Sequence, residues 1–304
     1  SEARRGWWPY TVPLVGVLAW FGGLWGLDPR TMSDLGLVSV LTPLAGAGLA
    51  LVVVGFAVAV TRSPLREGVV AAHLAGLVTI LFATPAVLYG TLRYSWAWKH
   101  AGIVDFIDRT GGIDPSIDVL PVYHNWPGFF AGSHALQELV GAGNVLLIAR
   151  WSPLVLTMAT VAAVVLLAAT LTDDRRVVWL TAGLFTVGNW VGQEYFSPQS
   201  LVYLLYLVAL ALTLRLARER QHGGRLVLAV VVLAVAIASS HQLTPAMLVI
   251  ALIGLAIAGW PRVLPLAVIS IVATATWALW GASHYVGENL RDVIDGFGQP
   301  LANA

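Results

Sequence analysis

The chain contains no cysteine, and only 11% of its 304 residues are charged. The lack of cysteine excludes a disulfide framework, a thiolate zinc site and a cysteine nucleophile. The shortage of charge is matched by 58% hydrophobic residues and a mean hydropathy of +0.79, and a water-soluble chain of this length could not bury so much apolar surface. The sequence therefore predicts an all-α, polytopic membrane protein. The net charge of +1 gives no indication of nucleic-acid binding.

Long apolar stretches, bounded by charges, proline or glycine, predict about nine membrane segments: 7–27, 37–60, 69–90, 153–171, 177–192, 201–214, 226–239, 246–259 and 263–281. The first four and the last approach the roughly 20 residues that a spanning helix needs. The other four are short, which is common where a bundle holds a polar cavity or a re-entrant hairpin. The pair 226–239 and 246–259 is a candidate for such a hairpin.

Charges divide unevenly between the loops on the two sides of this layout. With the N-terminus inside, the inner segments carry eleven basic and five acidic residues, and the outer segments carry six basic and eleven acidic residues. This bias follows the positive-inside rule, so we expect a multi-pass cell-membrane protein with a cytoplasmic N-terminus. Tryptophans near the expected span ends, such as Trp7, Trp25 and Trp260, fit an aromatic belt at the headgroup level.

The longest loop, 91–152, falls on the outer side and contains two amphipathic patterns. We expect interfacial helices at about 96–110 and 128–142, lying on the membrane surface. In the first helix an apolar face is opposed by a charged one: Trp96, Ile103, Val104 and Ile107 against Asp105, Asp108 and Arg109. In the second, Phe129, Leu136 and Val140 face one way, while His134 and Glu138 sit four apart on the other face, close enough to pair.

Between these two helices, the stretch 111–127 reads GGIDPSIDVLPVYHNWP. Its glycines and prolines force an irregular, stiffened path. Polar and aromatic side chains crowd into it: Asp114, Asp118, Tyr123, His124, Asn125 and Trp126. Such a mixture at a membrane surface is typical of a binding site, and the alternative is a solvated loop with a tryptophan anchor.

Two further outer segments carry polar side chains. The first, 193–199, contains Gln193, Glu194 and Gln199, and a carboxylate at the edge of the apolar slab is costly unless paired, hydrated or bound to a cation. The second, 239–245, is SSHQLTP, and two half-helices that meet at a polar break commonly form a ligand site. The alternatives are a solvated turn and a plain helix connector. Because all three polar segments fall on one side, we expect them to converge on one pocket.

The layout resembles the GT-C superfamily of membrane glycosyltransferases, in particular its protein-mannosyltransferase-like branch. In that branch a long first outer loop holds two membrane-surface helices, with a glycine, an irregular stretch and a proline-containing start of the second helix. Gly111–Gly112 and Trp126-Pro127-Gly128-Phe129-Phe130 stand in those places. The resemblance covers about residues 69–281 and is architectural more than motif-level.

The resemblance implies a single transmembrane domain over residues 1–304. The GT-C-like core is 69–281 with its outer loop 91–152, residues 1–68 add two N-terminal spans, and 282–304 form an outer C-terminal segment. Because the sequence starts at Ser1 rather than Met, we expect a trimmed chain in which Ala304 need not be the true end. One departure is clear, since the branch usually has an acidic residue after the helix preceding the long loop, where this chain has Thr91, Leu92, Arg93 and Tyr94.

The resemblance also implies the reaction: inverting transfer of a sugar from a polyprenyl-phosphate donor to a lipid or glycan acceptor on the outer face. A carboxylate removes the acceptor proton, and the leaving phosphate needs cationic or hydrogen-bonding support. The candidate bases are Asp118 first, then Asp105, with Glu194 as a further catalytic or metal-binding group. Asp28 and Asp34 in the loop 28–36 are further alternatives. The candidate substrate-binding residues are Arg93, Lys99, Tyr123, His124, Asn125, Trp126, Gln199, His241 and Gln242.

A divalent metal, Mg²⁺ or Mn²⁺, is a possible cofactor, with Glu194 and His241 as its candidate ligands. A transporter or flippase of lipid-linked glycans is the main alternative function. The lack of a charged residue well inside any span and of a convincing inverted repeat argues against it. A lipid-linked polymer ligase and a non-catalytic scaffold are further alternatives.

Overall fold

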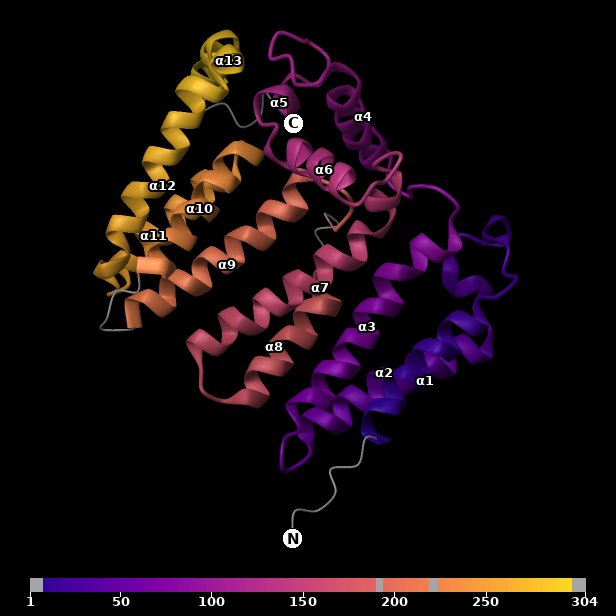
Figure 1. Cartoon of the computed structure of the whole chain (residues 1–304). Helices are drawn as coiled ribbons and strands as arrows, with labels where there is room; N and C mark the ends of the chain where they lie inside the picture. Colours follow the sequence, from indigo (N-terminus) through magenta and orange to yellow (C-terminus); the bar gives the residue numbers. More distant parts are fainter. Residues whose placement is uncertain (1–7, 190–193, 219–223, 297–304) are drawn as a thin grey trace. The chain divides into compact units, whose positions relative to one another are not determined.

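The structure is a computed structural model that describes residues 8–189, 194–218 and 224–296 (Figure 1). These residues form helices and no β-strand beyond one isolated bridge between Ser33 and Gly36. The α-helices are α1 (Trp8–Gly23), α2 (Pro43–Thr61), α3 (Glu67–Leu88), α4 (Ser95–Thr110), α5 (Pro121–Asn125), α6 (Gly128–Leu139), α7 (Leu146–Leu171), α8 (Arg175–Gly188), α9 (Pro198–Arg218), α10 (Gly224–Ser240), α11 (Thr244–Ile257), α12 (Leu264–Thr276) and α13 (Ser283–Gly296). Shorter turns are η1 (Pro29–Thr31), η2 (Leu37–Val40), η3 (Pro261–Val263) and the π-helical turn η4 (Trp277–Gly281).

Among the described residues, five helical stretches are long and apolar enough to cross a membrane: α2, α3, α7, α9 and the continuous stretch Pro261–Gly281. Helices α10 and α11 are apolar but shorter. The predicted all-helical membrane protein is confirmed at this level. The count of nine segments and the orientation stay predictions.

Two predicted boundaries were wrong. The segment expected at 201–214 is not short, because α9 runs for 21 residues and keeps Arg215 and Arg218 in its last turn. The long loop does not extend to residue 152, because α7 already begins at Leu146 and takes Arg150 into its second turn. The second boundary was misplaced because Arg150 was counted as a loop residue, whereas it lies in the second turn of α7 and donates to the carbonyl oxygen of Ala86 at the end of α3.

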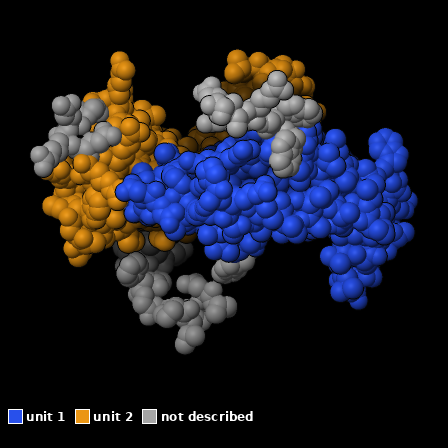
Figure 2. Space-filling view, turned by 90° about the horizontal axis from the view of Figure 1, so that it is seen from below, with its two compact units in different colours: residues 1–97, 149–196 blue, residues 98–148, 197–304 orange. Residues whose placement is uncertain are grey.

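The chain forms two compact units, each assembled from two separate stretches (Figure 2). Unit 1 is residues 1–97 and 149–196, and unit 2 is residues 98–148 and 197–304. Most of the long loop therefore belongs to the same unit as α9 to α13.

In unit 1, α1 and α2 approach so closely that glycine is required at their crossing. A Cβ at Gly48 would lie 2.5 Å from the carbonyl oxygen of Gly16 and 2.6 Å from the backbone nitrogen of Trp20. Trp20 is 5% exposed, and its Nε1 donates to Thr84 Oγ1 of α3 at 2.8 Å. In an apolar span such a hydrogen bond removes a polar cost and fixes α1 against α3.

Arginines satisfy the carbonyls left over at helix ends in unit 1. Arg176 of α8 donates to the backbone oxygens of Val60, Thr61 and Arg62 at the C-terminus of α2. A separate ion pair joins Arg175 to Glu67 at the start of α3. The Glu67 carboxylate also accepts a hydrogen bond from Trp179 Nε1 at 2.9 Å. The last carbonyls of a helix have no partner within it, and a cation placed there also meets the negative end of the helix dipole.

The core of unit 2 is built by α9, α10, α11 and α12. Its buried side chains are almost all aliphatic: Val202, Ala209, Leu216, Val230, Ala234, Ile237, Leu248, Leu252, Leu266 and Ala267. Large apolar residues on the other faces of the same helices are exposed, for example Leu228, Ile250 and Val268. Exposed apolar faces on such helices are suited to lipid contact.

Candidate functional site

Helices α4 and α6 in the long loop have the helical form that the sequence predicts. On α4 the apolar residues Ile103, Val104 and Ile107 are 6%, 0% and 5% exposed, whereas Asp105 and Asp108 on the opposite side are exposed. This agrees with the prediction for these residues, but Trp96, which was expected on the same apolar face, is 43% exposed. The location of the two helices at a membrane surface stays a prediction.

The buried face of α6 differs from the expected one. Phe129, Phe130 and Gln137 are buried, but Leu136 and Val140 are 43% and 58% exposed. The expected face combined Phe129 with Leu136 and Val140. The fold buries the aromatic start of α6 in unit 2 and leaves the later aliphatic residues exposed.

The charged side of α4 and the buried amide of α6 border a cavity of about 280 Å³ in unit 2. It is lined by Trp98, Ala101, Gly102, Asp105, Asp108, Gln137, Gly143, Asn144, Val145 and Leu146. Gln137 Nε2 donates to Asp108 Oδ1 at 3.4 Å, and Asp105 Oδ2 accepts from Arg109 Nε at 2.8 Å. Carboxylates, amides and an aromatic ring around one hollow are the groups that recognise hydroxyl-rich ligands.

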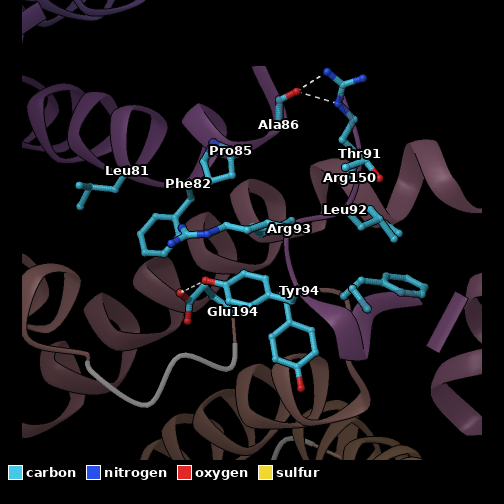
Figure 3. A pocket seen from close by; sticks show the side chains of 15 residues that line it. Leu81, Phe82, Pro85, Ala86, Thr91, Leu92, Arg93, Tyr94, Arg150 and Glu194 are labelled. Carbon is cyan, nitrogen blue, oxygen red and sulfur yellow. Dashed lines mark hydrogen bonds between the residues drawn. The ribbon is translucent and has the colours of Figure 1, made fainter. Parts of the chain in front are cut away.

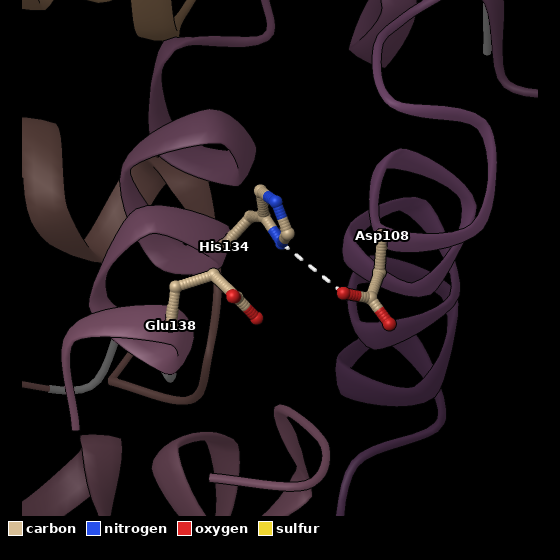
Figure 4. A group of neighbouring side chains, drawn as sticks. All are labelled: Asp108, His134 and Glu138. Carbon is tan, nitrogen blue, oxygen red and sulfur yellow. Dashed lines mark ion pairs between the residues drawn. The ribbon is translucent and has the colours of Figure 1, made fainter. Parts of the chain in front are cut away.

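Beside this cavity, Asp108, His134 and Glu138 come together (Figure 4). One ligand atom from each lies within 4.8 Å of the other two, and His134 Nδ1 is 3.6 Å from Asp108 Oδ1. The expected partner of His134 was Glu138 on its own helix, but the ion pair found is with Asp108 of α4. Glu194 and His241, the predicted metal ligands, belong to no such group among the described residues.

Asn125 is fully buried and joins the stretch 111–127 to the C-terminal part of the chain. Its Nδ2 donates to the carbonyl oxygens of Pro115 and Pro121, and its Oδ1 accepts from the backbone N–H of Tyr285 at 3.2 Å. Its own carbonyl accepts from Trp277 Nε1 at 3.0 Å. Its amide is therefore fully occupied by protein groups, an arrangement suited to fixing the loop.

The neighbours of Asn125 also point into the protein. His124 is 2% exposed, its ring stands edge-on to Phe106, and its Nδ1 accepts from the backbone N–H of Asp114 at 3.4 Å. Burial lowers the pKa of His124, while hydrogen bonds from Ser116 lower the pKa of the Asp114 carboxyl.

Two aromatic rings complete this packing. Tyr123 packs against Phe130 with ring centres 5.2 Å apart, and Trp126, 8% exposed, meets Tyr285 edge-on at 5.5 Å. Asp118, the first-choice base, lies in the same loop but is exposed.

The segment 239–245 meets the start of α6 inside unit 2. A Cβ at Gly128 would lie 2.4 Å from Ser240 Oγ and 2.8 Å from Ser239 Oγ, so only glycine allows this contact. The segment 239–245 thus meets the residue directly after the predicted polar segment 111–127, and the convergence of these two segments on one pocket stays a prediction. The third is divided between the units at Phe196 and Ser197, and its convergence with the other two stays a prediction.

His241 caps the N-terminus of α11. Its Nδ1 accepts from the backbone N–H groups of Leu243 and Thr244 at 3.4 and 3.3 Å, which leaves Nε2 as the nitrogen able to meet a ligand. Burial lowers the pKa of His241 to about 4, so the ring is neutral at pH 7. The adjacent Gln242 is exposed.

In unit 1, Glu194 lies in a small pocket of about 70 Å³ with Arg93 and Tyr94 (Figure 3). Tyr94 Oη is 3.5 Å from Glu194 Oε1, and the guanidinium of Arg93 lies 5.4 Å from the centre of the Tyr94 ring. Burial and the Glu194 carboxylate raise the pKa of Tyr94, which stays a neutral donor. Glu194 Oε2 is buried without a hydrogen-bond donor among the described residues. Gln193, expected beside it, lies outside those residues, as do Trp7 and Trp190.

No family model, characterised protein or solved structure matches this chain.

The remaining predicted substrate-binding residues, Lys99 of α4 and Gln199 of α9, are exposed. The sequence analysis missed the grouping of Asp108, Gln137 and Asn144. The sequence offered two signals: the three-residue spacing of Asp105 and Asp108 on one helix, and the four-residue spacing of His134 and Glu138 on the next. Spacing within each helix does not say which faces of the two helices meet.

Proposed function

We propose that the protein is a membrane glycosyltransferase that moves a sugar from a polyprenyl-phosphate donor to a lipid or glycan acceptor. The observation that carries the proposal is the acidic cavity between α4 and the α6–α7 connection. Its volume of about 280 Å³ is near the lower end of small-molecule sites, roughly 300 Å³, and is suited to one sugar ring rather than a large cofactor.

Within this cavity, Asp105 is the best-placed base among the three candidates from the sequence. Asp105 lines the cavity, whereas Asp118 lies in the loop outside its lining and Glu194 lies in the pocket of unit 1. The bond between Asp105 and Arg109 orients the carboxylate and keeps a positive charge beside it.

The proposed reaction is a single inverting displacement. The acceptor oxygen forms a bond to the anomeric carbon while its proton passes to Asp105, and the bond from that carbon to the phosphate oxygen breaks with its electron pair leaving on the phosphate. Gln137 and Asn144 hydrogen-bond the sugar hydroxyls, and Trp98 packs on the ring. Lys99, the neighbour of Trp98 on α4, binds the phosphate.

The block Tyr123-His124-Asn125-Trp126 has a positioning role in this proposal. The Asn125 amide and His124 Nδ1 are held by protein groups, and the rings of Tyr123 and Trp126 pack against Phe130 and Tyr285. A stiff loop between α4 and α6 keeps the two walls of the cavity in register, since catalysis loses rate steeply when reacting groups shift by about 1 Å.

The test is transfer of sugar from a polyprenyl-phosphate donor by the purified protein in proteoliposomes. Asp105→Asn should lower turnover by about 10²- to 10⁴-fold, because a general base contributes on that order. Asp118→Asn is the matched control, with the same chemical change in the same loop, and should keep turnover within about threefold. If turnover falls with Asp118→Asn and not with Asp105→Asn, Asp118 is the base instead. If both variants keep their turnover, the mechanism is refuted.

The same vesicles separate the enzyme from the transporter. An enzyme consumes the donor and forms a glycosidic product on one side of the membrane. Movement of intact lipid-linked glycan between the two leaflets, with no product formed, would instead establish a flippase.

A further inference from the structure

We propose that Asp108, His134 and Glu138 form a binding site for a divalent transition-metal ion that ties α4 to α6. The three residues come from two helices, Asp108 from α4 and the other two from one face of α6. Their ligand atoms lie within 4.8 Å of one another, and the side chains point toward a shared space (Figure 4).

A second observation points to a ligand at this place. His134 Nδ1 is buried, yet it has no hydrogen-bond partner among the described residues, and its nearest anionic neighbour, Asp108 Oδ1, is at 3.6 Å. A buried nitrogen of this kind normally finds a partner. The exposed carboxylates of Asp108 and Glu138 also lie within 4.8 Å of one another, and a cation between them would remove their mutual repulsion. A cation resolves both features at once.

The geometry needs only small movements to bind an ion. An ion with bonds of about 2.1 Å holds adjacent ligand atoms roughly 3.0–3.4 Å apart. The pair His134 Nδ1 and Asp108 Oδ1 is already close to this separation, at 3.6 Å. Glu138 is exposed, so its side chain can rotate inward without disturbing the core. Gln137 donates to Asp108 Oδ1 and orients that carboxylate, as groups behind metal ligands commonly do.

The donor set selects the class of ion. One imidazole nitrogen with two carboxylate oxygens suits Zn²⁺ or Mn²⁺, whereas Mg²⁺ and Ca²⁺ prefer sites made of oxygen alone. Three protein ligands leave coordination positions for water or for an oxygen of a bound molecule. Asp108 also lines the cavity of about 280 Å³, so the ion lies at its edge.

The binding experiment uses the full chain, purified without a histidine tag, stripped with a chelator and reconstituted in nanodiscs. Zn²⁺ is titrated by calorimetry and Mn²⁺ by loss of the free-ion electron paramagnetic resonance signal, with Mg²⁺ and Ca²⁺ as competitors. We expect one saturable site that Zn²⁺ and Mn²⁺ fill in preference to Mg²⁺ and Ca²⁺. No sugar is present, so the outcome is independent of the proposed transfer reaction.

Substitutions then test the ligand assignment. Asp108→Asn and His134→Gln should each weaken binding by at least about 30-fold, because each removes a ligand. Asp105→Asn is the matched control: it removes the same charge from the same helix face one turn earlier, where the carboxylate is held by Arg109, and should change affinity by less than about threefold.

A rescue variant protects the test against simple misfolding. Glu138→Gln should lose binding, whereas Glu138→His restores a ligand and should bind Zn²⁺ while losing affinity for Mn²⁺, since imidazole favours the former. Absence of saturable binding by the parent protein would overturn the site. An equal loss of metal affinity in Asp105→Asn and Asp108→Asn would also overturn it, because it would indicate general attraction of cations to a negative surface.

Discussion

The side chain of Asn125 accepts a hydrogen bond from the backbone N–H of Tyr285, 160 positions later in the chain, at 3.2 Å. Both residues belong to unit 2, and the same asparagine also holds the carbonyls of Pro115 and Pro121. One amide thus joins the irregular stretch between α4 and α6 to the segment that follows α12. This residue therefore fixes the stretch that connects α4 and α6, the two helices that contribute to the proposed site.

Removal of the Asn125 amide should destabilise unit 2. Asn125→Ala removes the acceptor of the part-buried N–H of Tyr285 and the donor to the carbonyls of Pro115 and Pro121, at an expected cost of about 1–3 kcal/mol. Asn125→Asp should cost more, because it directs a carboxylate at two carbonyl oxygens. Melting of the purified protein measures both effects. Gln199→Ala, which truncates an exposed amide, should change the melting temperature little, and equal shifts in all variants would contradict the assigned role.

The crossing of α1 and α2 predicts opposite effects for two glycines of one helix. Gly48→Ala should destabilise unit 1 by about 1–3 kcal/mol, because its Cβ would meet backbone atoms of α1 that cannot rotate away. Gly46→Ala meets no heavy atom within 4 Å and should be neutral or stabilise by about 0.5–1 kcal/mol. Denaturation by detergent titration distinguishes the pair, and matching behaviour would show that the helices are not in close contact.

Arg150 should contribute to stability although it lies within α7, one of the helices long and apolar enough to cross a membrane. Its guanidinium donates through Nε and Nη2 to the carbonyl oxygen of Ala86 at the end of α3 (Figure 3). Arg150→Met leaves that carbonyl without a donor, which should cost about 1–3 kcal/mol in thermal unfolding. For comparison, Arg109→Met removes an exposed pair with Asp105, worth less than about 1 kcal/mol. A larger loss of thermal stability in Arg109→Met than in Arg150→Met would contradict this ranking.

Stability should depend on pH through His241. Its pKa is about 4 in the folded protein against 6.5 for the free group, so between these values the unfolded chain binds more protons than the folded one. Stability is therefore full above about pH 6.5 and falls as the pH drops toward 4, by at most about 1.4 kcal/mol per pH unit. His241→Asn keeps a capping oxygen without titrating in this range. Its melting temperature should vary less between pH 7 and pH 4.5, and an unchanged pH profile would exclude His241 as the source.

Local patterns predicted the helices of the site well and the contacts between them poorly. The alternation on α4 correctly placed Ile103 and Val104 inside and Asp105 outside, because one helix face is determined by spacing alone. On α6 the same argument failed for Leu136, whose exposure depends on which neighbours cover the helix. The sequence predicted that His134 pairs with Glu138 on its own helix. The observed partner, Asp108 of α4, could not be predicted from spacing within one helix.

The amino-acid sequence by itself determined that this is an all-helical membrane protein, because long uncharged apolar runs have no other stable environment. It also indicated three polar segments, 111–127, 193–199 and 239–245, as candidate parts of one site. Only the tertiary structure decided which polar groups are occupied by the protein, such as Asn125 and His241, and which border a cavity, such as Asp105 and Asp108. The physical reason is that hydrogen bonds and ion pairs are short-ranged and need side chains from distant segments to meet, which packing alone arranges.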